Sequence, residues 1–306
     1  MAERLVDSPE VQELLDKLSG GNVGGGDPRL KAITRRIVGD LFATIEEFDI
    51  TEDEFWTFLN FASTGSGEYG LWAAGLGIER FLDIRADAKD AAAGVTGGTP
   101  RTIEGPLYVA GAPVVEGKAR LDDGTDKGEL LVMHGQVRDV NGKALPGAKV
   151  EVWHANTLGN YSYFDKTQSD FNLRRTIIAD ADGRYAYRSI VPAGYACPPG
   201  GSTENILKAI GRHGHRPAHI HFFVSADGHR HLTTQINIAG DPYLHDDFAY
   251  ATRDDLIPDL VHKTGGEPAT SLGVKGEYAD IAFDFVMHPA KTGEEEDASA
   301  RVRAAA

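Results

Sequence analysis

Cysteine is nearly absent from this chain, because Cys197 is the only one among 306 residues. A single cysteine forms no intramolecular disulfide and excludes a metal site built from several thiolates, so nitrogen and oxygen ligands remain. The sequence also lacks a run of about 20 apolar residues, which excludes a membrane-spanning helix. Its first residues carry neither the basic segment nor the apolar stretch of a signal peptide. We therefore expect a cytoplasmic protein.

Positive charge is scarce as well. The chain contains 31 Lys and Arg residues against 46 Asp and Glu residues, which gives a formal net charge of −15. No cluster of basic residues interrupts this balance, so binding to the phosphate backbone of a nucleic acid is unfavourable over most of the surface. We therefore expect neither nucleic acid nor a membrane as a partner.

Hydrophobic residues recur at helical spacing through about the first 90 residues of the chain. We predict a short helix over Pro9–Leu18 and a second helix that begins at the cap and first-turn proline of Asp27-Pro28. Residues 51–54, Thr-Glu-Asp-Glu, form a capping box that opens a third helix, and a fourth runs from about Trp72 to Asp90. These helices form either a small cap domain or an oligomer interface, and the sequence leaves both open.

The pattern changes after the small, glycine-rich stretch 91–100, which we interpret as a domain boundary. Short runs of alternating hydrophobicity follow, separated by turn signals, and this pattern is typical of an antiparallel sandwich or barrel. The predicted strands are Leu130–Val137, Val150–His154, Arg184–Ile190, His219–Val224, His231–Ile238 and Ile281–Met287. We predict an α+β protein with a helical region over 1–95, a mostly antiparallel β-sandwich over 96–290 and a disordered tail over 291–306.

Two histidines two residues apart, His219 and His221, lie in one strand-forming run. Alternate side chains of a strand project from one face, so both imidazoles can reach one metal ion. The pattern alone fits a metal site, and it also fits a half-buried strand with surface histidines. A carboxylate is the usual partner of two histidines in iron(II) sites, yet residues 222–226 contain none. Asp227, in a turn, and Asp241, in a Gly-Asp-Pro loop, are formal candidates.

Two further segments leave strands and turn, and each presents a tyrosine. Tyr161 ends the run 153–161, and Tyr195 lies in the rigid Pro/Gly loop 192–199. A phenol titrates near pH 10 and needs a strong Lewis acid to become an anion at neutral pH, so packing is the simplest interpretation of each side chain. If both tyrosines bind a metal, that metal is hard and trivalent.

Three separated motifs, taken in order, carry a family resemblance. The first runs from Met133-His134-Gly135 to Gly159-Asn160-Tyr161, the second is Pro192-Ala193-Gly194-Tyr195, and the third is Arg216-Pro217-Ala218-His219-Ile220-His221. On these motifs, the chain from about Leu71 to Met287 resembles the intradiol ring-cleaving dioxygenases, closest to the branch that cleaves catechol. The helical N-terminal region fits this family as well.

The resemblance implies one iron(III) ion per subunit, held by Tyr161, Tyr195, His219 and His221. Two phenolate ligands stabilise iron(III) over iron(II), so the metal would activate chelated catecholate for attack by O₂ instead of binding O₂ first. The implied reaction is cleavage of catechol to cis,cis-muconate in the degradation of aromatic compounds. By analogy with the family, Tyr195 is the ligand that leaves the metal and takes a substrate proton, while Tyr161 stays.

The resemblance also assigns residues around the substrate. Arg216 matches an arginine that stabilises negative charge developing on the substrate, and Gln235 matches a glutamine near it. Without the family, a surface ion pair and an ordinary polar strand residue would explain them. Leu76, Ile103 and Pro106 match residues that line the pocket for the ring, although helix packing explains Leu76 equally well.

The family further implies a homodimer, formed by the N-terminal helices around a bound lipid. Leu30, Ile33 and Ile37 are compatible with such an interface. They are equally compatible with a monomeric helical cap.

Several alternatives stay open at this point. The segment Thr102–Val109 favours the catechol branch over the hydroxyquinol branch, but chlorocatechol enzymes share much of it, so cleavage of chlorocatechol is the nearest alternative. A remote one is a zinc hydrolase that uses His219, His221 and an acid. Another is a transthyretin-like binding module without chemistry.

Overall fold

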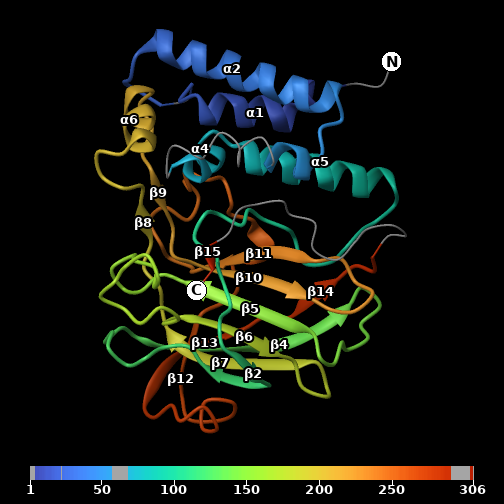
Figure 1. Cartoon of the computed structure of the whole chain (residues 1–306), viewed down its shortest axis with the longest axis vertical. Coiled ribbons are helices and arrows are strands. Elements are labelled where there is room, and N and C mark those ends of the chain that lie inside the picture. Colours follow the sequence, from blue (N-terminus) through green and yellow to red (C-terminus); the bar gives the residue numbers. More distant parts are fainter. Residues whose placement is uncertain (1–3, 22, 57–67, 291–303, 306) are drawn as a thin grey trace.

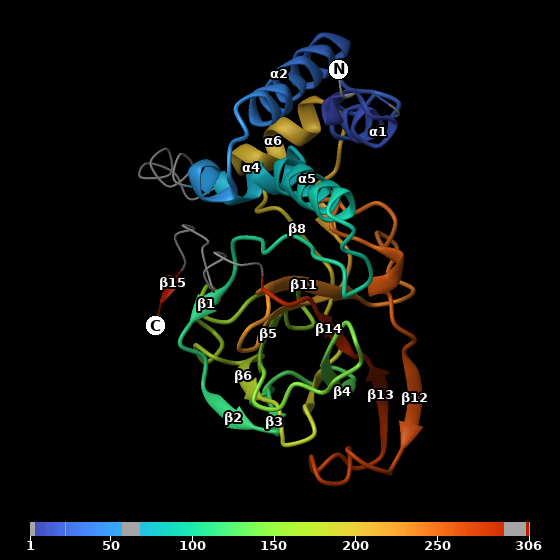
Figure 2. The ribbon, with the colours of Figure 1, turned by 90° about the vertical axis from the view of Figure 1, so that its right-hand side faces the viewer.

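The computed structural model describes residues 4–21, 23–56, 68–290 and 304–305. A layer of helices lies over a β-sandwich, as Figures 1 and 2 show from two sides. The helices come mostly from the first part of the chain, and the described strands all follow residue 108. The predicted α+β class with a helical N-terminal region is therefore confirmed.

Two helices of the helical layer begin at the capping residues that the sequence predicts. Its elements are η1 (Leu5–Asp7), α1 (Pro9–Leu18), α2 (Pro28–Glu47), α4 (Tyr69–Gly75), α5 (Ile78–Ala92) and, from later in the chain, α6 (Ser202–Ala209). Asp27 caps α2 by accepting a hydrogen bond from the N–H of Arg29 at 2.7 Å. The capping box also forms, because the N–H of Glu54 donates to Thr51 Oγ1 at 3.2 Å and the N–H of Thr51 donates back to Glu54 Oε2 at 2.9 Å. The helix that it opens is described as far as residue 56.

The single helix predicted from about 72 to 90 is wrong, because this stretch forms two helices. α4 ends at Gly75, α5 begins at Ile78, and Gly77 between them has a φ of 71°. Glycine adopts this left-handed backbone at little cost, and the conformation interrupts a right-handed helix. A Cβ atom at Gly77 would also lie 3.2 Å from Leu18 Cδ2, so α1 packs closely against the break.

Helix α2 has one buried face and one open apolar face. Phe42 and Ile45 are completely buried among the other helices. The exposed fractions of Leu30, Ile33 and Ile37 are 39%, 40% and 62%. These three residues form an outward apolar strip, which we call the α2 strip.

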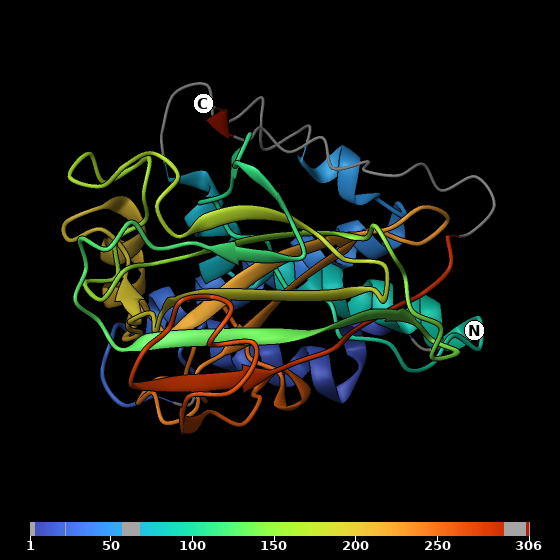
Figure 3. The same cartoon turned by 90° about the horizontal axis from the view of Figure 1, so that it is seen from below.

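Two sheets form the sandwich. The sheet nearer the helices has the order β11-β10-β5-β6-β2, and the other has the order β12-β13-β4-β7-β3 with β14 beside β4. The strands, seen from below in Figure 3, are β1 (Val109–Ala110), β2 (Val114–Glu116), β3 (Lys118–Arg120), β4 (Leu130–Asp139), β5 (Lys149–His154), β6 (Arg174–Ile178), β7 (Arg184–Ile190), β8 (Tyr195–Ala196), β9 (His215–Arg216), β10 (His219–Ser225), β11 (Leu232–Asn237), β12 (Val261–Thr264), β13 (Glu277–Ala282), β14 (Phe285–Met287) and β15 (Ala304–Ala305). One hydrophobic core fills the space between the sheets and includes Val152, Ile220, Phe222, Tyr187 and Phe285.

The mostly antiparallel sandwich is confirmed, although its sheets also contain parallel pairs. β2 pairs with β6, β3 with β7, and both β13 and β14 with β4, all in parallel. Parallel partners require long crossover connections, and these pairs indeed join strands that are far apart in the sequence. Local alternation of hydrophobicity identifies a strand but carries no information about so distant a partner.

The strand predicted over Ile281–Met287 is also divided. β13 ends at Ala282, β14 begins at Phe285, and both lie beside β4. At the break the backbone of Phe283 crosses Gly135 so closely that a Cβ atom at Gly135 would lie 1.7 Å from the Phe283 carbonyl oxygen. The glycine of β4 therefore makes room for the interruption.

Strand β10 turns a hydrophobic face and a polar face in opposite directions. It forms the predicted hairpin with β11 and pairs with β5 on its other side. Ile220 and Phe222 face the core between the sheets. Because strand side chains alternate, His219 and His221 project from the other face, toward the helical layer.

Near the end of the chain, β15 pairs in parallel with β1 in a separate two-stranded sheet. The other residues of the expected disordered tail, 291–303 and 306, lie outside the described part of the chain. Within the described ranges, no helix is both long enough and apolar enough to cross a lipid bilayer.

Candidate metal centre and active site

His219 and His221 bring their ring nitrogens together on the helix-facing side of β10. The two Nε2 atoms lie 3.0 Å apart, and each residue is 1% exposed. In the sheet, His221 is paired with Gln235 on β11 and with Trp153 on β5. Both histidines therefore stand on a strand that is held on both sides.

Tyr161 and Tyr195 reach the same point from two loops. The phenol oxygen of Tyr161 lies 3.3 Å from His219 Nε2. The ring centroid of Tyr195 is 5.5 Å from that of Tyr161 and 5.4 Å from that of His219. Tyr161 is buried, whereas Tyr195 is half-buried. The structure thus brings together all four residues of the predicted ligand set.

Glycines allow the two tyrosine loops to close against each other and against β9. A Cβ atom at Gly159, whose φ is 78°, would lie 2.8 Å from Tyr195 Cβ. A Cβ atom at Gly194 would lie 2.5 Å from the Arg216 carbonyl oxygen. The pairing of β8 with β9 sets Tyr195 directly opposite Arg216. A larger residue at either glycine would push the tyrosines away from the histidines.

The donor atoms of this cluster fit a cation. His219 Nδ1 lies 2.6 Å from the Pro217 carbonyl oxygen, which can only accept, so Nδ1 carries the proton and Nε2 presents a lone pair. His221 Nε2, the Tyr161 oxygen and Arg216 Nη1 all crowd this lone pair, at 3.0, 3.3 and 3.0 Å. One lone pair accepts one good hydrogen bond, whereas a metal ion would use the imidazole and phenol donors together.

Burial sets the protonation of these ligand candidates. It lowers the pKa of His219 to about 3, with help from the Arg216 cation, and it lowers the pKa of His221 well below its ordinary value, with help from His219. Both imidazoles are therefore neutral at neutral pH, as metal ligands must be. Burial and the neighbouring Tyr195 raise the pKa of Tyr161 well above its ordinary value, so this phenol needs a cation beside it to ionise.

In the described part of the chain, no carboxylate joins the two histidines in a group that could hold a metal ion. Among the residues that the structure describes, no group of three or more His, Cys, Asp and Glu side chains could hold a metal ion. Asp241 accepts hydrogen bonds from the N–H groups of Ala218 and Tyr243 at 2.9 and 2.8 Å, and Asp227 lies in the turn between β10 and β11. The acid that a zinc hydrolase would need is thus not found with the two histidines in the described part of the chain.

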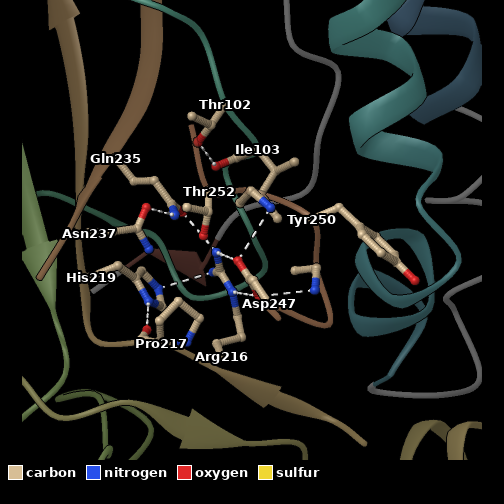
Figure 4. Close-up of polar contacts among 12 residues, drawn as sticks. Thr102, Ile103, Arg216, Pro217, His219, Gln235, Asn237, Asp247, Tyr250 and Thr252 are labelled. Atoms are coloured by element: carbon tan, nitrogen blue, oxygen red, sulfur yellow. Dashed lines mark hydrogen bonds and ion pairs between the residues drawn. The ribbon is translucent and has the colours of Figure 1, made fainter. Parts of the chain in front are cut away.

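Arg216 lies buried beside the four ligand candidates. Its Nη2 donates to Gln235 Oε1 at 2.8 Å, and its Nε and Nη2 donate to the carboxylate of Asp247 at 3.2 and 3.1 Å (Figure 4). Burial lowers the pKa of Arg216, but Asp247 and Tyr195 raise it by more, so the pKa lies above its ordinary value. Arg216 is therefore a permanent cation at the edge of the site.

Sequence reasoning missed Asp247 and Trp153. Asp247 is 31 residues from Arg216, so its only signal was the general need of a buried arginine for a carboxylate. The indole of Trp153 is stacked on His221, with centroids 4.9 Å apart and 6° between the rings. The pattern of β5 could have placed Trp153 in a strand but not beside His221.

The predicted pocket residues separate into two places. Ile103 is buried in a cluster with Ala74, Phe248 and Ala249, against which Leu71 packs. Leu76 packs against the cluster of the helices instead. Leu71 and Ala74, three residues apart on α4, share the cluster of Ile103.

Pro106 lies beside the same helix. It is exposed, and a Cβ atom at Gly70 of α4 would lie 2.8 Å from Pro106 Cβ. The neighbouring Gly105 approaches the metal candidates, because its Cβ position is 3.7 Å from His221 Cε1. The segment 103–106 therefore runs between α4 and the histidines.

His154, at the end of β5, has a structural role. Its Nε2 and Nδ1 lie 2.7 Å from Ser189 Oγ and from the Ala155 carbonyl oxygen. Burial lowers its pKa to about 4, and the residue is completely buried. Both ring nitrogens of this buried core histidine therefore have hydrogen-bond partners.

Two family models match the chain. Residues 103–289 match a model described as dioxygenase, and residues 27–94 match one described as catechol dioxygenase N terminus. Together these segments include all four ligand candidates, Arg216 and most of the helical layer.

Named relatives and solved structures agree with these matches. Catechol 1,2-dioxygenase 2 of Acinetobacter lwoffii is 64% identical over 81% of this chain and 91% of its own length. The crystal structure of catechol 1,2-dioxygenase from Pseudomonas arvilla C-1 is 55% identical, covers 99% of both chains and has a TM-score of 0.75. Chlorocatechol 1,2-dioxygenase of Rhodococcus opacus is 33% identical over 79% of this chain and 91% of its own length. The chain belongs to the intradiol dioxygenase family, on the branch of the catechol 1,2-dioxygenases.

Proposed function

We propose that this protein cleaves catechol with O₂ between the two hydroxyl-bearing carbons and releases cis,cis-muconate, as a step in the degradation of aromatic compounds. Both oxygen atoms enter the product, so the reaction needs no external reductant. The observation that carries the proposal is the meeting of the Tyr161 phenol oxygen and His221 Nε2 with His219 Nε2, at 3.3 and 3.0 Å, beside the buried Arg216.

The proposed cofactor is one iron(III) ion per subunit, held by Tyr161, Tyr195, His219 and His221. Two neutral nitrogen ligands and two phenolic oxygen ligands suit iron(III). None of the four is a thiolate, which agrees with the single cysteine of the chain. When bound, iron(III) would supply a Lewis acid that a catecholate could chelate, and this would activate the ring toward O₂.

The residues around this centre have separate roles in the proposal. As a phenolate, Tyr195 would take one of the two catechol protons and become a phenol, and its half-buried position supports its choice over the buried Tyr161. The guanidinium of Arg216 stabilises negative charge that develops on the substrate, because it is a fixed cation in a water-poor site. Gln235 accepts from Arg216 Nη2 and so helps to orient it.

The pocket proposed for the substrate ring is apolar. Ile103, as predicted, forms part of its lining, and we add Leu71 and Ala74 of α4 because they pack in the same cluster as Ile103. Pro106, which lies against Gly70 of α4, borders this pocket in the proposal. Apolar walls exclude water from the ring. Plain catechol is proposed as the substrate over chlorocatechol because the identity to the chlorocatechol relative is lower.

For the assembly, we propose that residues 1–95 are a dimerisation region and that residues 96–290 form the catalytic sandwich. The α2 strip supports a homodimer, because its three apolar side chains are exposed and Ile37 is 62% exposed. Replacing Ile37 by Glu should yield monomers in light scattering. A wild-type protein that is already monomeric would contradict the homodimer.

A bound lipid at this interface is a further part of the proposal. Beneath the α2 strip lies an apolar cavity of about 160 Å³, bordered by Ile37, Trp72, Leu76 and Leu207. Mass spectrometry of an organic extract from the purified protein would test it, since the proposal expects a lipid in a fixed ratio to the chain. The cytoplasm is the proposed location, in agreement with a single cysteine that is buried.

Substrate-dependent O₂ uptake with identification of the product tests the function. Iron-loaded protein should be red, because tyrosinate-to-iron(III) charge transfer absorbs visible light. It should consume one O₂ for each catechol and form one cis,cis-muconate. A colourless, iron-loaded and inactive protein would overturn the proposal. Cleavage outside the two hydroxyl-bearing carbons would overturn it as well.

A further inference from the structure

The guanidinium of Arg216 is held on two of its three nitrogens. Nε donates to Asp247 Oδ1 at 3.2 Å, and Nη2 donates to Asp247 Oδ2 at 3.1 Å and to Gln235 Oε1 at 2.8 Å. The third nitrogen, Nη1, points the other way and lies 3.0 Å from His219 Nε2 (Figure 4). Asp247 thus occupies one edge of the fork, while the opposite nitrogen faces the proposed metal centre.

Asp247 is itself held in place by the backbone. The N–H of Ala249 donates to Oδ1 at 3.0 Å and the N–H of Ala251 donates to Oδ2 at 3.3 Å. The side chains of Arg216 and Asp247 are 3% and 2% exposed, so solvent does not compete for either group. A buried bidentate pair of this kind has one favoured geometry.

The loop that carries Asp247 is tied to the helical layer. Arg212 donates to the Phe248 carbonyl oxygen at 3.0 Å, and it also donates to the carbonyl oxygens of Leu18 at 2.6 Å and Gly75 at 2.7 Å. Leu18 ends α1 and Gly75 ends α4. The position of the Asp247 carboxylate is therefore determined by three parts of the fold.

We propose that Asp247 is a positioning residue for ring cleavage: its carboxylate fixes the rotation of the Arg216 guanidinium so that the N–H groups of Nη1 face the bound substrate. An arginine stabilises developing charge best when it is already oriented, because reorientation during the reaction costs free energy. Without Asp247, Gln235 alone would hold the guanidinium through one hydrogen bond and leave it free to turn. This inference rests on the proposed function.

The test uses the iron-loaded full-length protein and the near-isosteric substitution Asp247→Asn. We expect kcat to fall about 100-fold, the order seen when one oriented donor to a developing charge is lost. The dissociation constant for catechol without O₂, measured by optical titration, should stay at the wild-type value, because catechol is bound mainly by chelation. Iron content and the visible band of the resting enzyme should also be unchanged. The matched control is Asp246→Ala, which removes the adjacent carboxylate, 78% exposed and paired with His213, and should leave kcat unchanged.

A double-mutant cycle separates positioning from general damage to the fold. If Asp247 acts through Arg216, Asp247→Asn should lower kcat in the wild type but not in the Arg216→Ala background. An equal loss in both backgrounds would overturn the inference, and so would a wild-type kcat in Asp247→Asn. Loss of the resting visible band in Asp247→Asn would overturn it too, because Asp247 would then act on the ligands. If the wild type itself forms no muconate, that result refutes the proposed function, independently of the double-mutant cycle.

Discussion

The indole of Trp153 lies parallel to the imidazole of His221, with their centroids 4.9 Å apart and 6° between the ring planes. Tyr108 meets the same indole edge-on, with centroids 5.0 Å apart, and donates through its hydroxyl to Glu151 at 2.7 Å. His219 differs, because its ring is oriented by a hydrogen bond to the Pro217 carbonyl oxygen. The two histidines on one strand are thus held in different ways, one by stacking and one by a backbone acceptor.

Loss of the stacking between Trp153 and His221 should weaken iron binding. We expect Trp153→Leu to increase the rate of iron loss to a chelator about 10- to 100-fold, the usual effect of losing a group that orients a ligand. Trp153→Phe keeps an aromatic face and should lie between Trp153→Leu and the wild type. Iron loss that is as slow in Trp153→Leu as in the wild type would contradict a role for the stack.

The two tyrosines should each contribute to the colour of the iron-loaded protein. We expect Tyr161→Phe and Tyr195→Phe to change the position or intensity of the visible band, since each removes one phenolate. Tyr185→Phe is the matched control, because Tyr185 is a buried tyrosine of the sandwich core that donates to the Phe283 carbonyl oxygen at 2.8 Å. Absorption spectra of the three variants at equal iron content make the comparison. A band unaffected by both site substitutions would show that the ligand set is wrong.

His154 should make the protein less stable in mild acid. Burial lowers its pKa in the folded state to about 4, below the model-peptide value of 6.5. As the pH falls below 6.5, the unfolded chain takes up a proton that the folded chain does not, so the free energy of unfolding decreases. Between pH 6.5 and pH 5 this group should account for about 2 kcal/mol.

Urea denaturation of wild type and His154→Gln at both pH values measures that difference. We expect His154→Gln to be less stable than the wild type but to lose less stability on acidification. His262→Gln is the control, because His262 lies on the exposed strand β12. An equal pH dependence in wild type and His154→Gln would rule out His154 as the source.

Gly194 should be intolerant of even one added methyl group. A Cβ atom there would lie 2.5 Å from the Arg216 carbonyl oxygen and 3.2 Å from the Ala218 nitrogen, both of which belong to the backbone. We expect Gly194→Ala to lower the free energy of unfolding by about 1–3 kcal/mol and to bind less iron, because the Tyr195 loop must move. Gly24→Ala, at a position where the new Cβ meets nothing within 4 Å, is the control. Equal iron content in the two variants would contradict this view of the loop.

Features that depend on neighbouring residues could be read from the sequence. Asp27 and Thr51 cap their helices as predicted, because a cap involves only the next few residues. Strand β7 has the predicted bounds, and His219 and His221 share a face because the period of a strand is local. The four ligand candidates could be named only through the family resemblance, since nothing in the spacing of Tyr161 and Tyr195 requires them to meet.

Features that depend on distant partners could not be read in this way. The parallel pairing of β13 with β4 joins residues almost 150 positions apart, as in Ala279 with Leu131. The contact between Asp247 and Arg216 likewise arises only when a loop after β11 folds back over β9. The break between α4 and α5 at the left-handed Gly77 was likewise not predicted, because the apolar spacing continues across it.

The hydrogen bonds of Arg212 limit where this chain can be divided into fragments. Two of the three carbonyl groups that its guanidinium binds belong to Leu18 and Gly75, at the ends of α1 and α4. A fragment that begins at the glycine-rich boundary would keep the sandwich and all four ligand candidates. It would leave the buried guanidinium of Arg212 without two of its three carbonyl acceptors. The boundary visible in the sequence is therefore a poor site for truncation or for exchanging modules between relatives, and grafts should carry the helices and the 246–251 loop from the same parent.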